Sequence, residues 1–257
     1  MRPAVLTDVS EDFVSELAVI RGCSEAEAST LAVEALVLTG KLAATWSELW
    51  CGRITIRKAW ILLDLLETLT PEQWATPSLC EGWSVRHVAA HLMVGPTGSI
   101  PGFIRALVRG RGSFARANTL LADDRAQLPT QTLVDDLRTR AGSRFTPPGM
   151  DWHAPLTDLL VHRLDITVPL GIDHGRPLQP WADALDLLLS KRATPAFIPR
   201  GLPRLTYAAP EIDWSRGSGV RVEGPAEAIA LAVTRRPVRL EQLTGPGSAA
   251  LKTWARG

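Results

Sequence analysis

Cysteine is scarce in this sequence, with three in 257 residues and no CxxC pair. Cys23, Cys51 and Cys80 are odd in number and far apart, whereas zinc ribbons need closely spaced pairs and disulfide-stapled domains need an even, dense set. The sequence therefore predicts neither kind of domain. A reducing, cytoplasmic location fits it best.

Long apolar runs and a strong charge of one sign are also missing. Stretches such as "AWILLDLLETL" are broken by acidic residues well short of the ~20 apolar residues that a membrane-spanning helix needs. The start "MRPAVLTDVSEDF" lacks a basic segment followed by an apolar run, so we expect no signal peptide. The formal net charge is +1, with no basic cluster on a nucleic-acid module, so we expect neither a nucleic-acid nor a membrane partner.

Several common catalytic signatures are absent as well. The chain has no HExxH motif and no GxSxG elbow, which argues against a zincin metalloprotease and an α/β-hydrolase. The glycine-containing stretches "GIDHGRP" and "GRGS" do not follow a strand and open a helix, as a phosphate-binding loop would. We interpret them as turns.

What the sequence does have is helical periodicity. Apolar residues make up 46% of the chain, which is enough for sizeable cores. Ser24, Thr70 with Pro71, and Ser84 are typical of helix starts. The pattern predicts helices within 12–50, in the leucine-rich stretch before Thr70, after Ser84, and at about 114–127, 131–141, 152–168 and 181–192.

After Pro199 the pattern changes. The stretches "LPRLTYAA" and "GSGVRVEG" are typical of strands, "PAEAIALAVTRR" of an amphipathic helix, and "VRLEQLTG" of a last short element. The sequence thus predicts a mainly α fold that closes with a small α+β unit.

One stretch, "LTDLLVHRLDI", carries Asp158 four residues before His162, on one face of a predicted helix. Side chains at this spacing can bind one ion together, and His91, on another apolar helix face, is the best third ligand. Three protein ligands with an open fourth position are typical of a catalytic zinc. The alternative, which the spacing leaves open, is a structural hydrogen bond or ion pair. The remaining histidines are His87, His153 and His174.

The stretch "LTPEQWATPSLCEGWSVRHVAAHL", residues 68–92, resembles the opening motif of the mycothiol-dependent maleylpyruvate isomerase family, whose members have a DinB-like four-helix bundle. The resemblance implies that His91, Asp158 and His162 bind a divalent metal, usually zinc. The family often has glutamate in place of Asp158 and aspartate in place of His87. The shorter carboxylate puts the ligand geometry in question, and His87 is either a fourth ligand or a surface residue.

Three further residues are candidates for roles at this site, Asp165 and Arg235 through the resemblance and Trp83 through its nearness to His91 in the sequence. Asp165 is a candidate to orient His162 or to bind the cofactor, the alternative being a helix-end acid without a special role. Trp83 is a candidate wall of a cofactor pocket, although core packing is the ordinary role of tryptophan. Arg235 matches an arginine that closes the family's C-terminal helix and could hold an anionic substrate, or it is a cation favoured by the helix dipole.

The resemblance covers about residues 59–250, and residues 12–57 resemble part of a helical domain that precedes HNH nucleases in actinobacterial proteins. No HNH motif follows, which weakens a DNA-binding role. We therefore expect a helical N-terminal segment (1–57), a DinB-like metal-binding bundle (58–195) and a small α+β domain (196–257).

The function implied is that of a mycothiol-dependent metalloenzyme, an S-transferase or isomerase that acts on a small electrophile through a thiolate. We expect it to be a monomer or a homodimer. The alternative is a non-catalytic or degenerate fusion with a structural or binding role.

Overall fold

The computed structural model describes residues 11–21, 24–29, 32, 56–140, 146–147, 149–172, 178, 180–194 and 197–257. The chain divides into two compact units, Met1–Thr55 and Ile56–Gly257. None of the helices in the described ranges is long and apolar enough to cross a membrane.

In the first unit, helix α1 (Glu11–Arg21) and the helical residues 25–29 share a small core of Val14, Ala18 and Ala28. The backbone N–H of Glu27 donates to Ser24 Oγ, which confirms Ser24 as a helix cap. Most of the helix predicted within 12–50 lies outside the described residues.

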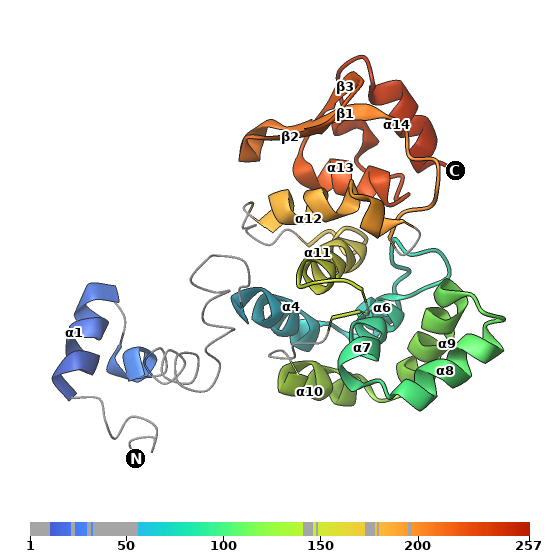
Figure 1. The fold of residues 1–257 in the computed structure, drawn as a ribbon. Helices are drawn as coiled ribbons and strands as arrows, with labels where there is room; N and C mark the ends of the chain where they lie inside the picture. Colours follow the sequence, from blue (N-terminus) through green and yellow to red (C-terminus); the bar gives the residue numbers. More distant parts are fainter. Residues whose placement is uncertain are drawn as a thin grey trace. The chain divides into compact units, whose positions relative to one another are not determined.

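The second unit begins with a series of helices (Figure 1). These are α4 (Ile56–Thr68), α5 (Pro71–Ala75), α6 (Val85–Leu92), α7 (Val94–Thr97), α8 (Ile100–Arg109), α9 (Phe114–Ala126), α10 (Thr130–Arg140), α11 (His153–Thr167) and α12 (Pro180–Leu188). The helices α4, α6, α10 and α11 contribute to one apolar core, in which Leu66, Val88, Leu133 and Ile166 are fully or almost fully buried. The predicted mainly α architecture is confirmed.

Local sequence explains where these helices begin. Thr70 caps α5 in a reciprocal capping box with Gln73, and Pro71 follows in the first turn. Helix α8 was not predicted, although Pro101 and Gly102 are compatible with a helix start. Both lie in its first turn, where backbone N–H groups have no partner within the helix, so the missing N–H of proline costs no hydrogen bond. The backbone N–H of Gly102 donates to the side chain of the cap residue Ser99.

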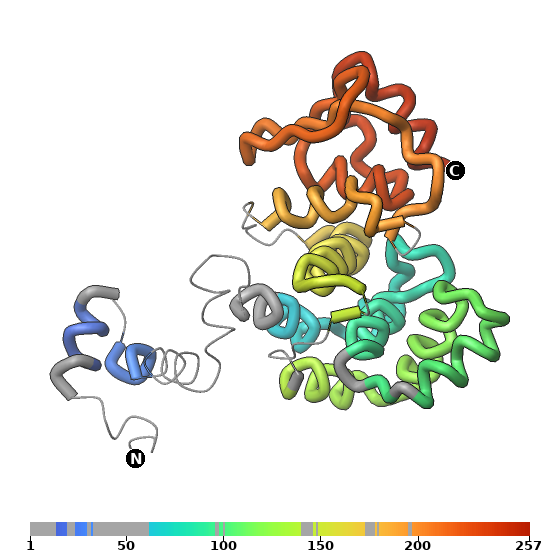
Figure 2. Tube along the Cα trace, viewed as in Figure 1, coloured from blue at the N-terminus to red at the C-terminus, as the bar shows by residue number. Residues whose placement is uncertain are grey.

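The chain ends in a small α+β unit, as predicted. Strands β1 (Leu205–Ala209), β2 (Trp214–Gly217) and β3 (Val220–Glu223) form a sheet in the order β2-β1-β3, followed by α13 (Ala226–Val233) and α14 (Ser248–Ala255). Strand β1 pairs antiparallel with β2 and parallel with β3. Figure 2 shows this orange to red part of the chain beside α12, which contacts α13.

Helix α11 belongs to two cores at once. Its Ile166 is buried in the helical core, whereas Leu160, Val161 and Leu164 pack into a second core with α12, β1 and α13. The small α+β part of the chain, from β1 to α14, therefore shares its core with α11 and α12. The predicted boundary at residue 195 stays a prediction.

Candidate metal centre

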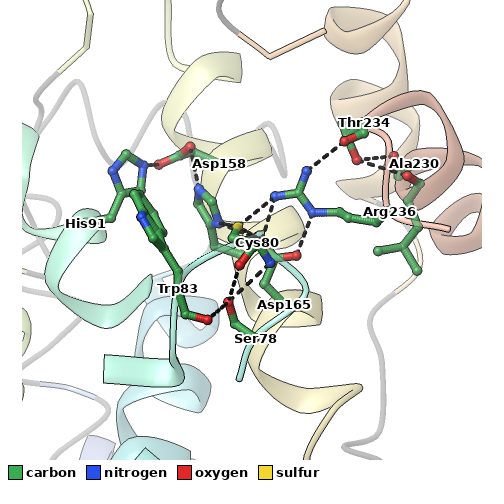
Figure 3. A network of polar contacts seen from close by, with 11 residues as sticks. Ser78, Cys80, Trp83, His91, Asp158, Asp165, Ala230, Thr234 and Arg236 are labelled. Carbon is green, nitrogen blue, oxygen red and sulfur yellow. Dashed lines mark hydrogen bonds and ion pairs between the residues drawn. The ribbon is translucent and has the colours of Figure 1, made fainter. Parts of the chain in front are cut away.

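Two packed helices bring together the three side chains that the sequence nominated as metal ligands. His91 lies in the last turn of α6, and Asp158 and His162 lie one turn apart on α11. His91 Nε2 is 3.5 Å from Asp158 Oδ2, and His162 Nε2 is 3.3 Å from Asp158 Oδ1. One ligand atom from each residue lies within 4.8 Å of the others (Figure 3).

Asp165 fixes the orientation of the His162 ring. Its Oδ2 lies 2.7 Å from His162 Nδ1, and its side chain is 0% exposed. Burial alone would raise the pKa of Asp165, but hydrogen bonds from Arg236 and His162 outweigh it and hold the pKa well below its usual range. A carboxylate accepts only, so Nδ1 of His162 carries a hydrogen and donates. Nε2 therefore points toward Asp158 and His91.

Arg236 anchors Asp165 from the C-terminal unit. Its Nε donates to Asp165 Oδ1 at 2.5 Å and its Nη2 donates to Oδ2 at 2.7 Å, so the pair is bidentate. Its Nη1 donates to the carbonyl of Thr234 at 2.9 Å. Figure 3 shows the guanidinium lying between Asp165 and the end of α13. The buried carboxylate is thus fully compensated by a cation.

A helix cap directs Arg236 into the site. At the end of α13 the backbone N–H of Arg236 donates to Leu231 O and that of Arg235 to Ala232 O, which is a Schellman motif. Arg235 takes the left-handed position of this motif, with a φ of 59°. Its guanidinium lies over the Trp254 ring, 4.2 Å from the centroid. The arginine in contact with the cluster is therefore Arg236, and not Arg235, which the sequence nominated.

A short loop from Ser78 to Trp83 places two more side chains against His162. Ser78 closes the loop by donating twice to the carbonyl of Trp83, from its backbone N–H and its hydroxyl. Gly82 provides the positive φ, 76°, that the turn requires. The Leu79 backbone N–H donates to the carbonyl of Asp165, which fastens the loop to α11.

The two side chains of the loop contact different parts of the cluster. The Trp83 ring lies 5.2 Å from the ring of His91 and is stacked 6.5 Å from that of His162, centroid to centroid. The Cys80 thiol donates to Asp165 Oδ2 at 3.1 Å and accepts from Arg236 Nη2 at 3.2 Å. Sequence reasoning did not nominate Cys80, although it lies inside the quoted family motif.

The charges in the cluster are strongly coupled. Burial opposes ionisation of Asp158, but the charges of His162 and His91 outweigh it and hold the pKa of Asp158 well below its usual range. Burial likewise opposes the charged form of His162, but the charge of Asp158 outweighs it and raises the pKa of His162 well above its usual range. Both shifts favour protonated His162 beside ionised Asp158 when no metal is bound.

The geometry suits a metal ion. Ligand atoms 2.0–2.1 Å from a tetrahedral zinc lie about 3.4 Å apart, close to the two separations from Asp158. The shorter side chain of aspartate therefore reaches both imidazoles. Nδ1 of His91 is buried and has no hydrogen-bond partner among the described residues, so this imidazole is less tightly oriented than His162.

The other histidines lie elsewhere. His87 Nδ1 accepts from the backbone of Ser84 at 3.3 Å and lies 2.8 Å from its hydroxyl, at the start of α6. Its Nε2 faces Asp123 at 3.9 Å, so it joins neither ligand group of the described residues. His153 pairs with Asp151, and His174 lies outside the described residues.

Comparison with known proteins gives one assignment. Neither the curated proteins nor the solved structures gave a match. Residues 56–147 match the family model described as the mycothiol maleylpyruvate isomerase N-terminal domain. This range includes Cys80, Trp83 and His91 but ends before α11, and the likeness of residues 12–57 to an HNH-associated domain stays a prediction. Residues 56–147 of this chain are therefore similar to the N-terminal domain of the mycothiol maleylpyruvate isomerase family, as the sequence motif predicted.

Proposed function

We propose that this protein is a mycothiol-dependent metalloenzyme in which His91, Asp158 and His162 hold a divalent cation. The observation that carries the proposal is the convergence of two imidazole nitrogens on one carboxylate at 3.3 and 3.5 Å, with one imidazole oriented by a buried second carboxylate. A histidine that donates its other N–H to a carboxylate is the usual arrangement around protein-bound zinc. Two nitrogens and one oxygen favour zinc among the common divalent ions.

Among the described residues, the two sides of this cluster differ in exposure. The Asp158 side chain is 31% exposed, whereas Asp165, on the other side of His162, is 0% exposed. A cosubstrate thiol would approach from the side of Asp158. A divalent cation bound there supplies positive charge that favours the ionised form of a thiol at neutral pH.

The surrounding residues have distinct proposed tasks. Trp83 provides an apolar wall beside His91 for the bound thiol or the electrophile. Asp165 keeps the hydrogen of His162 on Nδ1, so that Nε2 stays available to the metal. Arg236 keeps Asp165 ionised and in place.

The hydrogen bonds of Arg236 favour this positioning task over a substrate-binding one. A guanidinium has five N–H groups, and four of those of Arg236 are directed to Asp165, Cys80 and the carbonyl of Thr234. Both donors that would form a fork for a substrate carboxylate are already used by Asp165. We therefore propose that the substrate is a small electrophile that does not depend on a bidentate arginine contact, and that the reaction is S-transfer or cis-trans isomerisation.

Metal content of the purified protein tests the proposal. We expect about one zinc or similar ion per chain, retained in His87→Ala and lost in His91→Ala and His162→Ala. His87→Ala is the matched control, because His87 lies on the same helix as His91 but outside the ligand group. Loaded protein should then convert an electrophile only when mycothiol is present, with mycothiol consumed in an S-transfer and regenerated in an isomerisation. Wild-type protein that binds no ion after reloading would contradict the proposal and favour a structural or binding role.

A further inference from the structure

A second group of potential metal ligands lies directly behind His162. It consists of Cys80 Sγ, His162 Nδ1 and Asp165 Oδ2. The sulfur is 3.9 Å from the nitrogen and 3.1 Å from the oxygen, and the nitrogen and oxygen are 2.7 Å apart. Thiolate, imidazole and carboxylate together are a strong ligand set for zinc. The two groups share His162, which faces one with Nε2 and the other with Nδ1.

A cation already occupies this second group. Arg236 Nη2 is 2.7 Å from Asp165 Oδ2 and 3.2 Å from Cys80 Sγ. The Arg236 side chain is 13% exposed, so its charge is largely withdrawn from water and is compensated by Asp165. The guanidinium therefore has the charge sign and the partners that a metal ion would have at this position.

The two groups compete for a single imidazole. An ion bound to Nδ1 would displace the hydrogen that His162 donates to Asp165, and would remove the constraint that directs Nε2 toward Asp158 and His91. A thiolate-containing group would also attract soft divalent ions more strongly than a group of imidazoles and a carboxylate. An unguarded second group would therefore draw metal away from the first.

We propose that Arg236 is the resident cation of a latent metal site formed by Cys80, His162 and Asp165, and that its guanidinium keeps divalent ions out of this site. The part of the proposal that concerns the first ligand group rests on the proposed function. Removal of the guanidinium opens the latent site: a divalent ion that binds there forms a bond to the sulfur of Cys80 and displaces its thiol proton to solvent.

Cobalt(II) tests this directly, because cobalt bound to a thiolate has a charge-transfer absorption that cobalt bound only to nitrogen and oxygen lacks. The titration uses a Cys23→Ser/Cys51→Ser background, in which Cys80 is the only cysteine of the chain. We expect no thiolate absorption when Arg236 is present, and a strong one in Arg236→Ala. The matched control, Arg236→Ala with Cys80→Ser, should lack the absorption again.

A second measurement does not depend on whether Arg236→Ala folds. Loss of Arg236 leaves the buried charge of Asp165 uncompensated, which is strongly destabilising in typical cases. In the protein that keeps Arg236, we therefore expect metal loading to leave the alkylation rate of Cys80 within about twofold of the metal-free rate. Arg236→Lys retains a charge but not the planar fork. In this variant we expect metal loading to slow the alkylation of Cys80 in part, because some metal enters the latent site.

The outcomes separate the two proposals. A thiolate absorption or metal protection of Cys80 in the presence of Arg236 would overturn the inference, and so would a folded Arg236→Ala protein that binds no cobalt through Cys80. If the protein with Arg236 bound no ion but Arg236→Ala bound one through Cys80, the proposed function would fail and the latent site would be supported. Two results together support the proposed function and the latent site. The protein with Arg236 binds one ion without thiolate absorption, and the protein without Arg236 binds an ion through the thiolate.

Discussion

Arg236 and Asp165 form a bidentate ion pair across 71 residues of sequence, and this pair joins the C-terminal unit to the second coordination shell of the candidate metal centre. Asp165 in turn accepts from His162, so a single carboxylate connects the end of α13 with a proposed ligand. The centre therefore uses residues on both sides of the boundary of the matched domain, which ends at residue 147.

Replacing Asp165 should weaken metal binding without removing a ligand. We expect Asp165→Asn to lower zinc affinity roughly 10- to 100-fold, because loss of an outer-shell carboxylate usually has this effect. Competition with a chelator measures the affinity, and Asp123→Asn, a half-buried aspartate outside both ligand groups, is the control. An affinity within twofold of wild type would show that Asp165 does not orient His162.

Metal affinity should rise with pH across the neutral range. The pKa of His162 is raised in the metal-free protein, so this side chain is still protonated near neutrality and must release a proton when a cation binds. At lower pH the proton competes more strongly, and affinity falls. Calorimetry in buffers with different ionisation enthalpies should detect this proton release. Asp158→Asn removes the charge that raises the pKa of His162, so it should reduce the number of protons released at neutral pH.

The same pKa shift affects the stability of the metal-free protein. A group whose pKa is raised on folding contributes stability that is fully present below its unfolded pKa, about 6.5 for histidine, and is lost as pH rises through the folded value. The contribution of His162 should therefore decline above neutrality. Urea unfolding of wild type and Asp158→Asn at several pH values measures it. Parallel curves for the two proteins would contradict the assignment.

The two adjacent arginines should respond differently to mutation. Arg235→Gly relieves a left-handed backbone conformation, worth about 1 kcal/mol, but removes the contact with Trp254, worth about 0.5–1 kcal/mol at an exposed site. Its unfolding free energy and metal affinity should therefore remain close to wild type. Arg236→Lys should weaken metal binding. A weaker affinity in Arg235→Gly than in Arg236→Lys would reverse the two roles.

Packing behind the centre should be as important as its polar contacts. Ile166 is fully buried next to Asp165, so Ile166→Ala should lower the free energy of unfolding by about 2–5 kcal/mol. Ile166→Val should cost only about 0.5–1.5 kcal/mol. Denaturant unfolding compares them. A loss below about 0.5 kcal/mol for the alanine variant would contradict tight packing of α11 against the helical core.

The sequence was informative where the relevant signal is local. The spacing of Asp158 and His162 follows from helical periodicity, and the caps Thr70 and Ser24 follow from preferences within a few residues. The mainly α fold with a small C-terminal sheet could be predicted for the same reason. No helix was predicted at 100–109, although the proline near its start fits the first turn of a helix.

The less predictable parts of the site depend on tertiary contacts. Two neighbouring arginines are equivalent in a sequence pattern, and only the cap of α13 decides that Arg236 and not Arg235 reaches Asp165. Cys80 carries no metal-binding spacing of its own, because its neighbours His162 and Asp165 come from a distant helix. The one signal that could have identified Cys80 from the sequence is its position inside the motif that also contains His91.

Arg236 contacts the candidate metal centre but is the last of its residues to be synthesised. His91 leaves the ribosome first, then Asp158, His162 and Asp165 on α11, and Arg236 only after the three strands and α13. At a translation rate of roughly 5–20 residues per second, the interval from His91 to Arg236 is on the order of ten seconds. Between the synthesis of Asp165 and that of Arg236, the nascent chain carries a thiol, an imidazole and a carboxylate without their guanidinium partner, so the proposed latent site has no resident cation until α13 is complete.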